Sequence, residues 1–138
     1  YVAGGKGLVI VHFGCGAFQE HDAFVNVAGR IWNPDFRAHD PRGAFQVHIN
    51  NPDHPVTNGL TDFETTDELY TCLDGDMPIT VLCDAVSVVD QKTYPMAFTV
   101  EGTGGRVLHS VLGHDTVAFQ SSGVRALYRQ AAVWAAGL

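Results

Sequence analysis

Residues 7–13, Gly-Leu-Val-Ile-Val-His-Phe, form a continuous apolar run, and the triplet Gly14-Cys15-Gly16 interrupts it at once. An unbroken apolar run is typical of a strand buried on both faces, as in a parallel sheet covered by helices. Apolar residues then recur near helical spacing from Ala17 to Gly29. The final glycine of that segment suits the position just past a helix. The order strand, tight turn, helix predicts an α/β protein.

Local patterns predict further strands and helices. Alternating or β-branched residues indicate four strands, over residues 45–49, 79–89, 95–101 and 106–112. The last two flank a glycine-rich turn, so we expect them to form an antiparallel hairpin. Two helices are also expected, over residues 63–73 and 123–136. Acidic residues near its start favour the first helix, and a continuous apolar stripe favours the second.

Composition and charge exclude several classes of protein. With 138 residues, 46% of them hydrophobic, the chain is expected to form one packed domain, residues 1–138. Eight Lys and Arg against fifteen Asp and Glu give a formal net charge of −7. Because so acidic a chain lacks a diffuse positive field, we expect neither a nucleic-acid partner nor a membrane partner. No apolar run approaches the roughly 20 residues of a membrane-spanning helix.

The three cysteines, Cys15, Cys72 and Cys83, cannot all pair, and their spacing fits no zinc ribbon or disulfide scaffold. A reducing compartment or a lone reactive thiol fits better. Because no signal peptide is visible in the sequence, we expect a cytoplasmic protein. Cys15 lies on the glycine-flanked turn, where the amides at the start of a following helix would lower the thiol pKa and favour a nucleophile. Alternatively, Cys15 is a small buried residue and the glycines serve only the turn. We interpret Cys72 and Cys83 as packing residues.

A second candidate site follows the strand expected over 106–112, which ends at Gly113-His114-Asp115. Ligand sites of open α/β sheets lie at the carboxyl ends of strands. His114 would therefore share a site with His12 if their two strands run side by side in the same direction. A pair of Cys15 and His114 would then suit nucleophilic catalysis, with the histidine as the base. Alternatively, Asp115 caps the next segment and His114 only forms a nearby hydrogen bond.

Glu68 and the histidines supply further candidates. Glu68 belongs either to a capping box with Thr65 or Thr66 at the start of the helix expected over 63–73, or to a catalytic site. In such a site it would be a general acid or base, or a carboxylate that orients a histidine. A divalent ion such as zinc is a candidate cofactor, although no pair of ligands has a spacing as tight as H-x-x-x-H. The candidate ligands are His12, His39, Glu68 and His114. The other histidines are interpreted as a structural turn residue (His54) and as surface or strand-face residues (His21, His48 and His109).

Five stretches, in order along the chain, resemble the ThuA-like or trehalose-utilisation family of the class I glutamine amidotransferase-like superfamily. They are GKGLVIVHFGCGAF, AGRIWNPDFRAHDPRG, NPDHPVTNGLTDFETTDELYTCL, YPMAFTVEGTGGRVLHSVLGHD and ALYRQAAVWAAGL. The resemblance implies a flavodoxin-like α/β fold, a three-layer sandwich of which this chain is the C-terminal part, without the first N-terminal βα units. Such a chain would expose an apolar sheet edge, so we expect a homo-oligomer.

The resemblance also implies roles for individual residues. By position, Cys15 falls at the superfamily's nucleophile elbow, and His114 falls where amidotransferases carry their catalytic histidine. Two features depart from the amidotransferase pattern: the elbow here is FGCGA, and the acid Asp115 follows His114 by one residue and not by two. His12, Glu68 and His114 match the ThuA-like pattern better than Cys15 does. Cys15 is a supplementary catalytic candidate. Residues expected to bind substrate are His39, Asp67, Tyr70 and Asp115.

Three functions are compatible with these residues. The resemblance implies a bacterial carbohydrate-metabolism protein that acts on a small sugar: trehalose, a related disaccharide or its keto derivative. His114 or Glu68 would be the general acid or base, and His12 would position the substrate. Aromatic faces for the sugar would come from Phe13, Trp32 and Tyr70. The alternatives are a Cys–His amidohydrolase or amidotransferase-like enzyme that uses Cys15 and His114, and a non-catalytic sugar-binding or oligomerising module. The leading function requires the side chains of His12, Glu68 and His114 to converge within about 8 Å.

Overall fold

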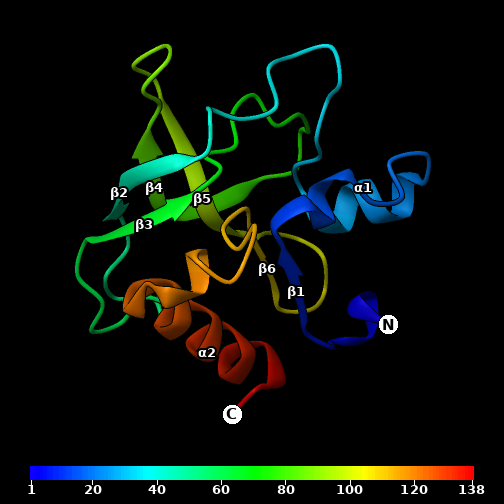
Figure 1. Cartoon of the computed structure of the whole chain (residues 1–138). Helices are drawn as coiled ribbons and strands as arrows, with labels where there is room; N and C mark the ends of the chain where they lie inside the picture. The colour runs from blue at the N-terminus through cyan, green and yellow to red at the C-terminus, as the bar shows by residue number, and fades with distance from the viewer.

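The computed structural model describes all residues from Tyr1 to Leu138. The chain is a mixed α/β protein with one six-stranded sheet, in the spatial order β1-β6-β5-β4-β2-β3 (Figure 1). The strands are β1 (Leu8–Val11), β2 (Gly43–Ile49), β3 (Phe63–Asp67), β4 (Ile79–Val86), β5 (Thr93–Val100) and β6 (Val107–Ser110). The helices are α1 (Asp22–Ala28) and α2 (Ser122–Ala136), with short 3-10 turns η1 (Val2–Gly4), η2 (His12–Gly16) and η3 (Ala118–Gln120).

β1 and β6 form the only parallel pair of the sheet. Leu8 lies opposite Val107 and Val11 lies opposite Ser110, so the two strands end side by side. All other neighbouring strands are antiparallel, including the predicted hairpin of β5 and β6. Within this chain β1 lies at the edge of the sheet, with β6 as its only partner.

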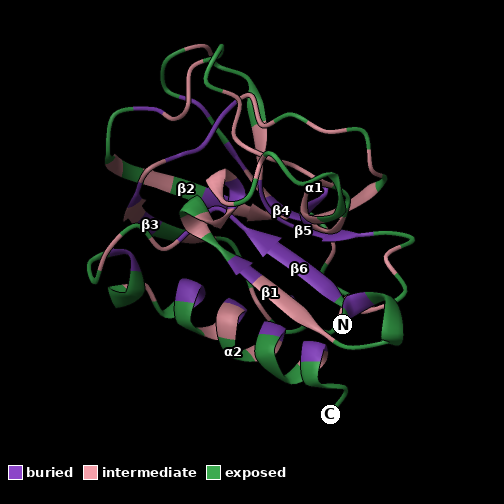
Figure 2. Cartoon of the chain, turned by 90° about the vertical axis from the view of Figure 1, so that its right-hand side faces the viewer, coloured by how far each residue is buried: buried purple, intermediate pink, exposed green.

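The two helices lie on opposite faces of the sheet at β1 and β6 (Figure 2). Val9 packs against the core cluster that includes the buried residues of α2, whereas Ile10 packs in a second cluster with Ala28 of α1. Successive residues of a strand point to opposite faces, so a strand covered on both sides needs apolar residues at every position. Within β1, however, only Ile10 is buried and Val11 is 41% exposed, so the predicted burial on both faces holds for only part of the apolar run.

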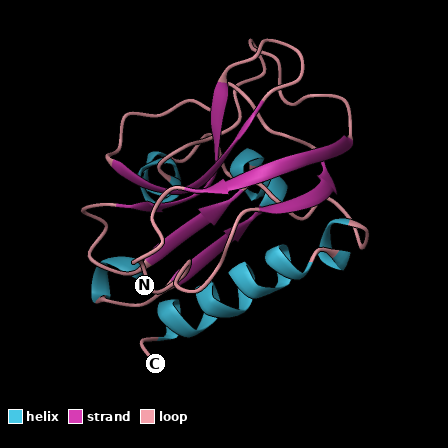
Figure 3. Ribbon diagram, turned by 90° about the vertical axis from the view of Figure 1, so that its left-hand side faces the viewer, coloured by secondary structure: helices cyan, strands magenta, loops and turns pink.

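The closing helix α2 confirms the predicted apolar stripe. Its buried residues include Val124, Leu127 and Ala131, which follow helical spacing, and the helix runs along one face of the sheet (Figure 3). Gly123 lies against Phe63 of β3, where an added Cβ would overlap the aromatic ring. The helix therefore begins in close contact with the far strand of the sheet. Neither α1 nor α2 is both long enough and apolar enough to cross a bilayer.

The helix predicted over 63–73 is wrong. Residues 63–67 form β3, which pairs with β2 at five positions, and residues 68–73 contain no helix. Thr65 is buried and Glu64 is exposed, so the side chains follow the period of two that a strand requires. Glu68 therefore follows a strand and belongs to no capping box, and neither Thr65 nor Thr66 is an N-cap.

The helix predicted from Ala17 to Gly29 is shorter than expected. After η2, Ala17 is extended, with φ −81° and ψ 144°. Phe18 has a left-handed φ of 49°, and α1 begins only at Asp22. The turn that carries Cys15 is therefore not followed directly by an α-helix, and the thiol does not lie at a helix N-terminus.

Candidate functional site

Three segments meet beyond the carboxyl ends of β1 and β6. His12 follows β1 directly, His114 lies four residues after the last residue of β6, and Glu68 follows β3. The parallel pairing of β1 and β6 places their carboxyl ends at the same edge, which meets the condition for a site shared by His12 and His114. His12 has a left-handed φ of 48°, which is uncommon for a residue other than glycine and turns the chain sharply where the strand ends.

The side chains of His12, Glu68 and His114, here called the His–Glu cluster, are in direct contact. His12 Nε2 lies 3.2 Å from His114 Nδ1. The Oε2 atom of Glu68 lies 3.4 Å from His12 Nε2 and 3.1 Å from His114 Nδ1. The predicted convergence of these three side chains is confirmed at hydrogen-bonding distance.

Backbone carbonyls fix the orientation of two imidazoles at this site. His12 Nδ1 lies 2.8 Å from the carbonyl oxygen of Val111. A carbonyl oxygen only accepts hydrogen bonds, so Nδ1 carries the proton and Nε2 of the neutral ring presents a lone pair. His39 is held in the same way by the carbonyl oxygen of Asp40, at 2.7 Å. Its Nε2 lies 3.8 Å from Glu68 Oε1, so His39 lies at the margin of the cluster.

Asp67 ties together the two loops that carry Glu68 and His114. Its fully buried carboxylate accepts backbone N–H groups of Gly113 at 2.6 Å, His114 at 3.1 Å and Glu68 at 2.8 Å. Gly113 has a φ of 107°, a conformation that favours glycine. Asp67 was expected to bind substrate, but its buried side chain offers no surface to one; its contacts position His114 beside Glu68. No local sequence pattern could show this role, because two of the three partners, the amides of Gly113 and His114, lie more than 40 residues away.

The family described as ThuA, trehalose utilisation, matches residues 1–135. The chain belongs to this family. A putative ThuA-like protein from Parabacteroides merdae is 25% identical, with a TM-score of 0.85 over 99% of this chain and 62% of that one. A putative ThuA-like protein from Bacteroides uniformis has the same fold, with 19% identity and a TM-score of 0.75 over 98% of this chain and 60% of that one. The chain thus spans about three-fifths of each structure. No curated protein matches it.

Aromatic rings lie on the His12 side of the cluster in this ThuA-family chain. The ring of Tyr70 is buried and meets the His12 ring edge-on, with centroids 5.1 Å apart. Burial raises the pKa of the Tyr70 phenol above its usual range. Phe13 is 49% exposed and contacts Trp32, with centroids 5.6 Å apart. Phe13 is therefore the ring of this group that presents most surface to a ligand.

Asp115 is occupied by contacts within the chain. One carboxylate oxygen accepts the backbone N–H groups of Val117 at 2.8 Å and Ala118 at 3.1 Å. The other accepts a hydrogen bond from Arg42 at 2.7 Å. These contacts correspond to the capping role that the sequence left open as an alternative to substrate binding.

The ThuA-family chain does not activate Cys15. Its side chain is fully buried, and burial raises the pKa of the thiol to about 11. No hydrogen bond joins Cys15 to either histidine of the His–Glu cluster, so the expected nucleophile with a lowered pKa is not formed. Cys83 is buried in the core, as predicted. Cys72 is half-buried and its sulfur lies 3.6 Å from the Tyr94 hydroxyl.

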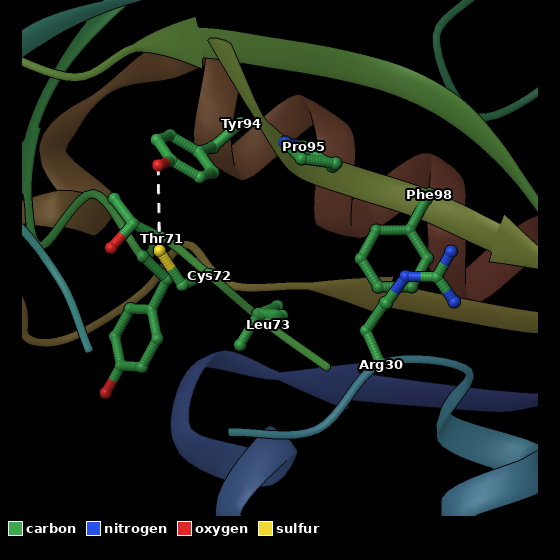
Figure 4. Close-up of a pocket in the computed structure, with 8 residues that line it drawn as sticks. Arg30, Thr71, Cys72, Leu73, Tyr94, Pro95 and Phe98 are labelled. Carbon is green, nitrogen blue, oxygen red and sulfur yellow. Dashed lines mark hydrogen bonds between the residues drawn. The ribbon is translucent and has the colours of Figure 1, made fainter. Parts of the chain in front are cut away.

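Cys72 and Tyr94 line a small cavity beside the site (Figure 4). Its volume is about 110 Å³, and Arg30, Leu73 and Phe98 form other parts of its wall. Tyr70 belongs to this wall and also contacts His12. No member of the His–Glu cluster lines the cavity, so it is a separate feature.

Proposed function

We propose that this ThuA-family protein acts on trehalose, a related disaccharide or its keto derivative, by acid–base chemistry at His12, Glu68 and His114. One observation carries the proposal: two imidazoles and a carboxylate, from segments up to 102 residues apart, meet within 3.4 Å of one another. Groups of these types at such distances can pass a proton to or from a bound hydroxyl. The parallel β1–β6 pair between two helices supports a flavodoxin-like, three-layer scaffold for this site.

The hydrogen bonds favour a different role for each of the three side chains of the cluster. His12 presents the Nε2 lone pair that a general base requires, because Val111 holds its Nδ1 proton. The Glu68 carboxylate is 85% shielded from solvent and lies within hydrogen-bonding distance of His114 Nδ1. It therefore orients the His114 ring, whose side chain is the most exposed of the three. Of the three side chains, His114 is thus the most accessible to a substrate.

Sugar recognition is proposed to involve the aromatic rings beside the cluster. The C–H face of a pyranose packs on an aromatic face while its hydroxyls need polar partners. Phe13 is 49% exposed, and its ring centroid lies 6.5 Å from that of Tyr70, which contacts His12. An added Cβ at Gly16 would overlap the Phe13 ring, so this glycine allows the ring its position.

The proposal is tested by turnover of a panel containing trehalose, related disaccharides and their keto derivatives. His114→Ala, His12→Ala and Glu68→Gln should each lower turnover by roughly 10²–10⁴-fold, the range expected when a general acid or base is removed. The matched control is His48→Ala, because His48 pairs with a carboxylate, Asp62, at 2.9 Å on the exposed surface. Turnover that survives in all three cluster variants, with thermal unfolding unchanged, would contradict the proposal.

A further inference from the structure

The His–Glu cluster concentrates lone pairs around one point. The Nδ1 protons of His12 and His39 are both committed to backbone carbonyls, so the Nε2 atoms of both neutral rings are acceptors. Both of these atoms lie within 4 Å of the Glu68 carboxylate, which is an acceptor as well. His114 Nδ1 alone can supply a proton to this group when the rings are neutral. An arrangement with more acceptors than donors is the arrangement that a cation completes.

The distances within the cluster match those between ligands of one transition-metal ion. Zinc is bound tetrahedrally by imidazole nitrogen and carboxylate oxygen at about 2.0–2.2 Å, which separates neighbouring ligand atoms by roughly 3.3–3.6 Å. The three atoms of the cluster lie 3.2, 3.4 and 3.1 Å apart. Shifts of a few tenths of an ångström would therefore suffice to bring all three into coordination. Two imidazoles with one carboxylate suit zinc or a similar transition metal better than calcium or magnesium, which prefer oxygen ligands.

Contacts outside the cluster are of the kind that support metal ligands. The Val111 carbonyl accepts the Nδ1 proton of His12 and thereby leaves the Nε2 lone pair to face the cluster. Asp67 holds the backbones of Glu68 and His114. The side chains of His12 and Glu68 are 12% and 15% exposed, whereas that of His114 is 39% exposed. Solvent therefore reaches the cluster mainly from the side of His114, here called the open side.

We propose that His12 Nε2, Glu68 Oε2 and His114 Nδ1 bind one divalent transition-metal ion of the zinc type. The open side leaves a coordination position for water or a substrate oxygen, as in catalytic rather than structural zinc sites. His39 lies outside the three ligands and faces the second carboxylate oxygen of Glu68. A role of the ion in catalysis rests on the proposed function, whereas binding of the ion does not.

The experiment uses the full chain, treated with a chelator, dialysed, and titrated calorimetrically with zinc alone. We expect one tight site per chain and a higher unfolding temperature in the presence of zinc, since a ligand that binds only the folded state stabilises it. Cobalt(II) in place of zinc should give visible absorption bands typical of a four- or five-coordinate ion. His12→Ala and His114→Ala should weaken binding by more than the roughly 10–100-fold that loss of an outer partner costs.

Two control variants make the result specific to these ligands. His48→Ala removes an exposed histidine that also faces a carboxylate, and His39→Ala removes the neighbour outside the ligand set; both should keep the tight site. Circular dichroism of the metal-free variants confirms that each one folds. One-to-one binding that persists in both His12→Ala and His114→Ala, or wild-type chain that takes up no zinc, overturns the proposal.

The outcomes also separate the metal site from the proposed function. Sugar turnover that is lost in cluster variants but resists the chelator in wild-type protein would contradict a catalytic role of the ion and support the acid–base function without it. Tight zinc binding without turnover of any sugar in the panel would support the metal site and contradict the proposed function.

Discussion

His109 is a histidine that the fold buries away from the His–Glu cluster. Its Nδ1 donates to the carbonyl oxygen of Ala28 at 2.8 Å, whereas its Nε2 has no hydrogen-bond partner. Burial lowers the pKa of the imidazole from 6.5 to about 4. The folded protein therefore holds this ring neutral under conditions in which the unfolded chain binds a proton.

This difference makes the stability of the fold depend on pH. Because the folded pKa lies below the unfolded one, the stabilising contribution of His109 is present above pH 6.5 and is lost as the pH falls to about 4. Between pH 7 and pH 4.5, wild-type protein should lose about 2–3 kcal/mol more unfolding free energy than His109→Gln. Urea unfolding at the two pH values measures this, with His21→Gln at an exposed histidine as the control. Equal losses in wild type and His109→Gln would show that His109 does not titrate on unfolding.

Local sequence separated the roles of individual histidines only in part. His12 and His114 could be placed because each lies at or just beyond the end of a recognisable strand, where ligand sites form. His109 was expected on a surface or strand face, and it does lie in β6. All four residues of β6 are buried, however. The strand therefore has no exposed face, and the sequence pattern could not show that His109 is buried.

Elements with strong local signals were predicted correctly, and β3 was not. The stripe of α2 and the hairpin of β5 and β6 are encoded by neighbouring residues. The residues of β3 gave a plausible helix start, with acids and threonines in suitable positions. What makes them a strand is pairing with β2 and contact with the start of α2, which come from distant parts of the chain. Tertiary contacts outweigh propensity in such a short segment.

Packing of α2 on the sheet should supply a large share of the stability of the fold. Leu127 is fully buried in the larger core cluster. Leu127→Ala should lower the unfolding free energy by roughly 2–5 kcal/mol, since it removes buried methyl groups and leaves a cavity. Val133→Ala on the same helix is the control, because Val133 is 46% exposed and its truncation should change stability by less than about 0.5 kcal/mol. Similar effects of the two substitutions, measured by urea unfolding, would mean that α2 is not anchored through this face.

At the scale of the whole molecule, the parallel pairing of β1 and β6 creates the candidate site. It brings residues 12 and 114 together, which the sequence could predict from strand ends and apolar pattern. The sequence could not predict where Glu68 lies, because Glu68 follows β3, which forms the edge of the sheet opposite to β1. The segment after β3 that carries Glu68 reaches the cluster because the Asp67 carboxylate accepts the backbone N–H groups of Gly113 and His114, which follow β6.

The same topology leaves two sheet edges with different surroundings. Beside β3, Ser121 donates to the backbone carbonyl of Glu64 at 2.8 Å, and Thr65 donates to that of Ala118 at 3.4 Å, so the segment leading into α2 covers this edge. β1 has no such cover. Because the amide of Leu8 donates to Arg106 beside β6, the amide of Val9 points to the open side. β1 is therefore the edge at which another strand can pair.

We expect this chain to self-associate through β1, with an average mass that rises above 14.9 kDa as its concentration increases. Val9→Pro removes a donor from the open edge without removing a bond to β6, and should keep the chain monomeric in light scattering coupled to size-exclusion chromatography. Phe36→Ser, at an aromatic side chain that is 57% exposed, tests the alternative that exposed apolar groups cause association. A mass that falls in Phe36→Ser but not in Val9→Pro would assign the contact to the surface. A wild-type chain that stays monomeric at all concentrations would show that the open edge of β1 does not pair with a second copy.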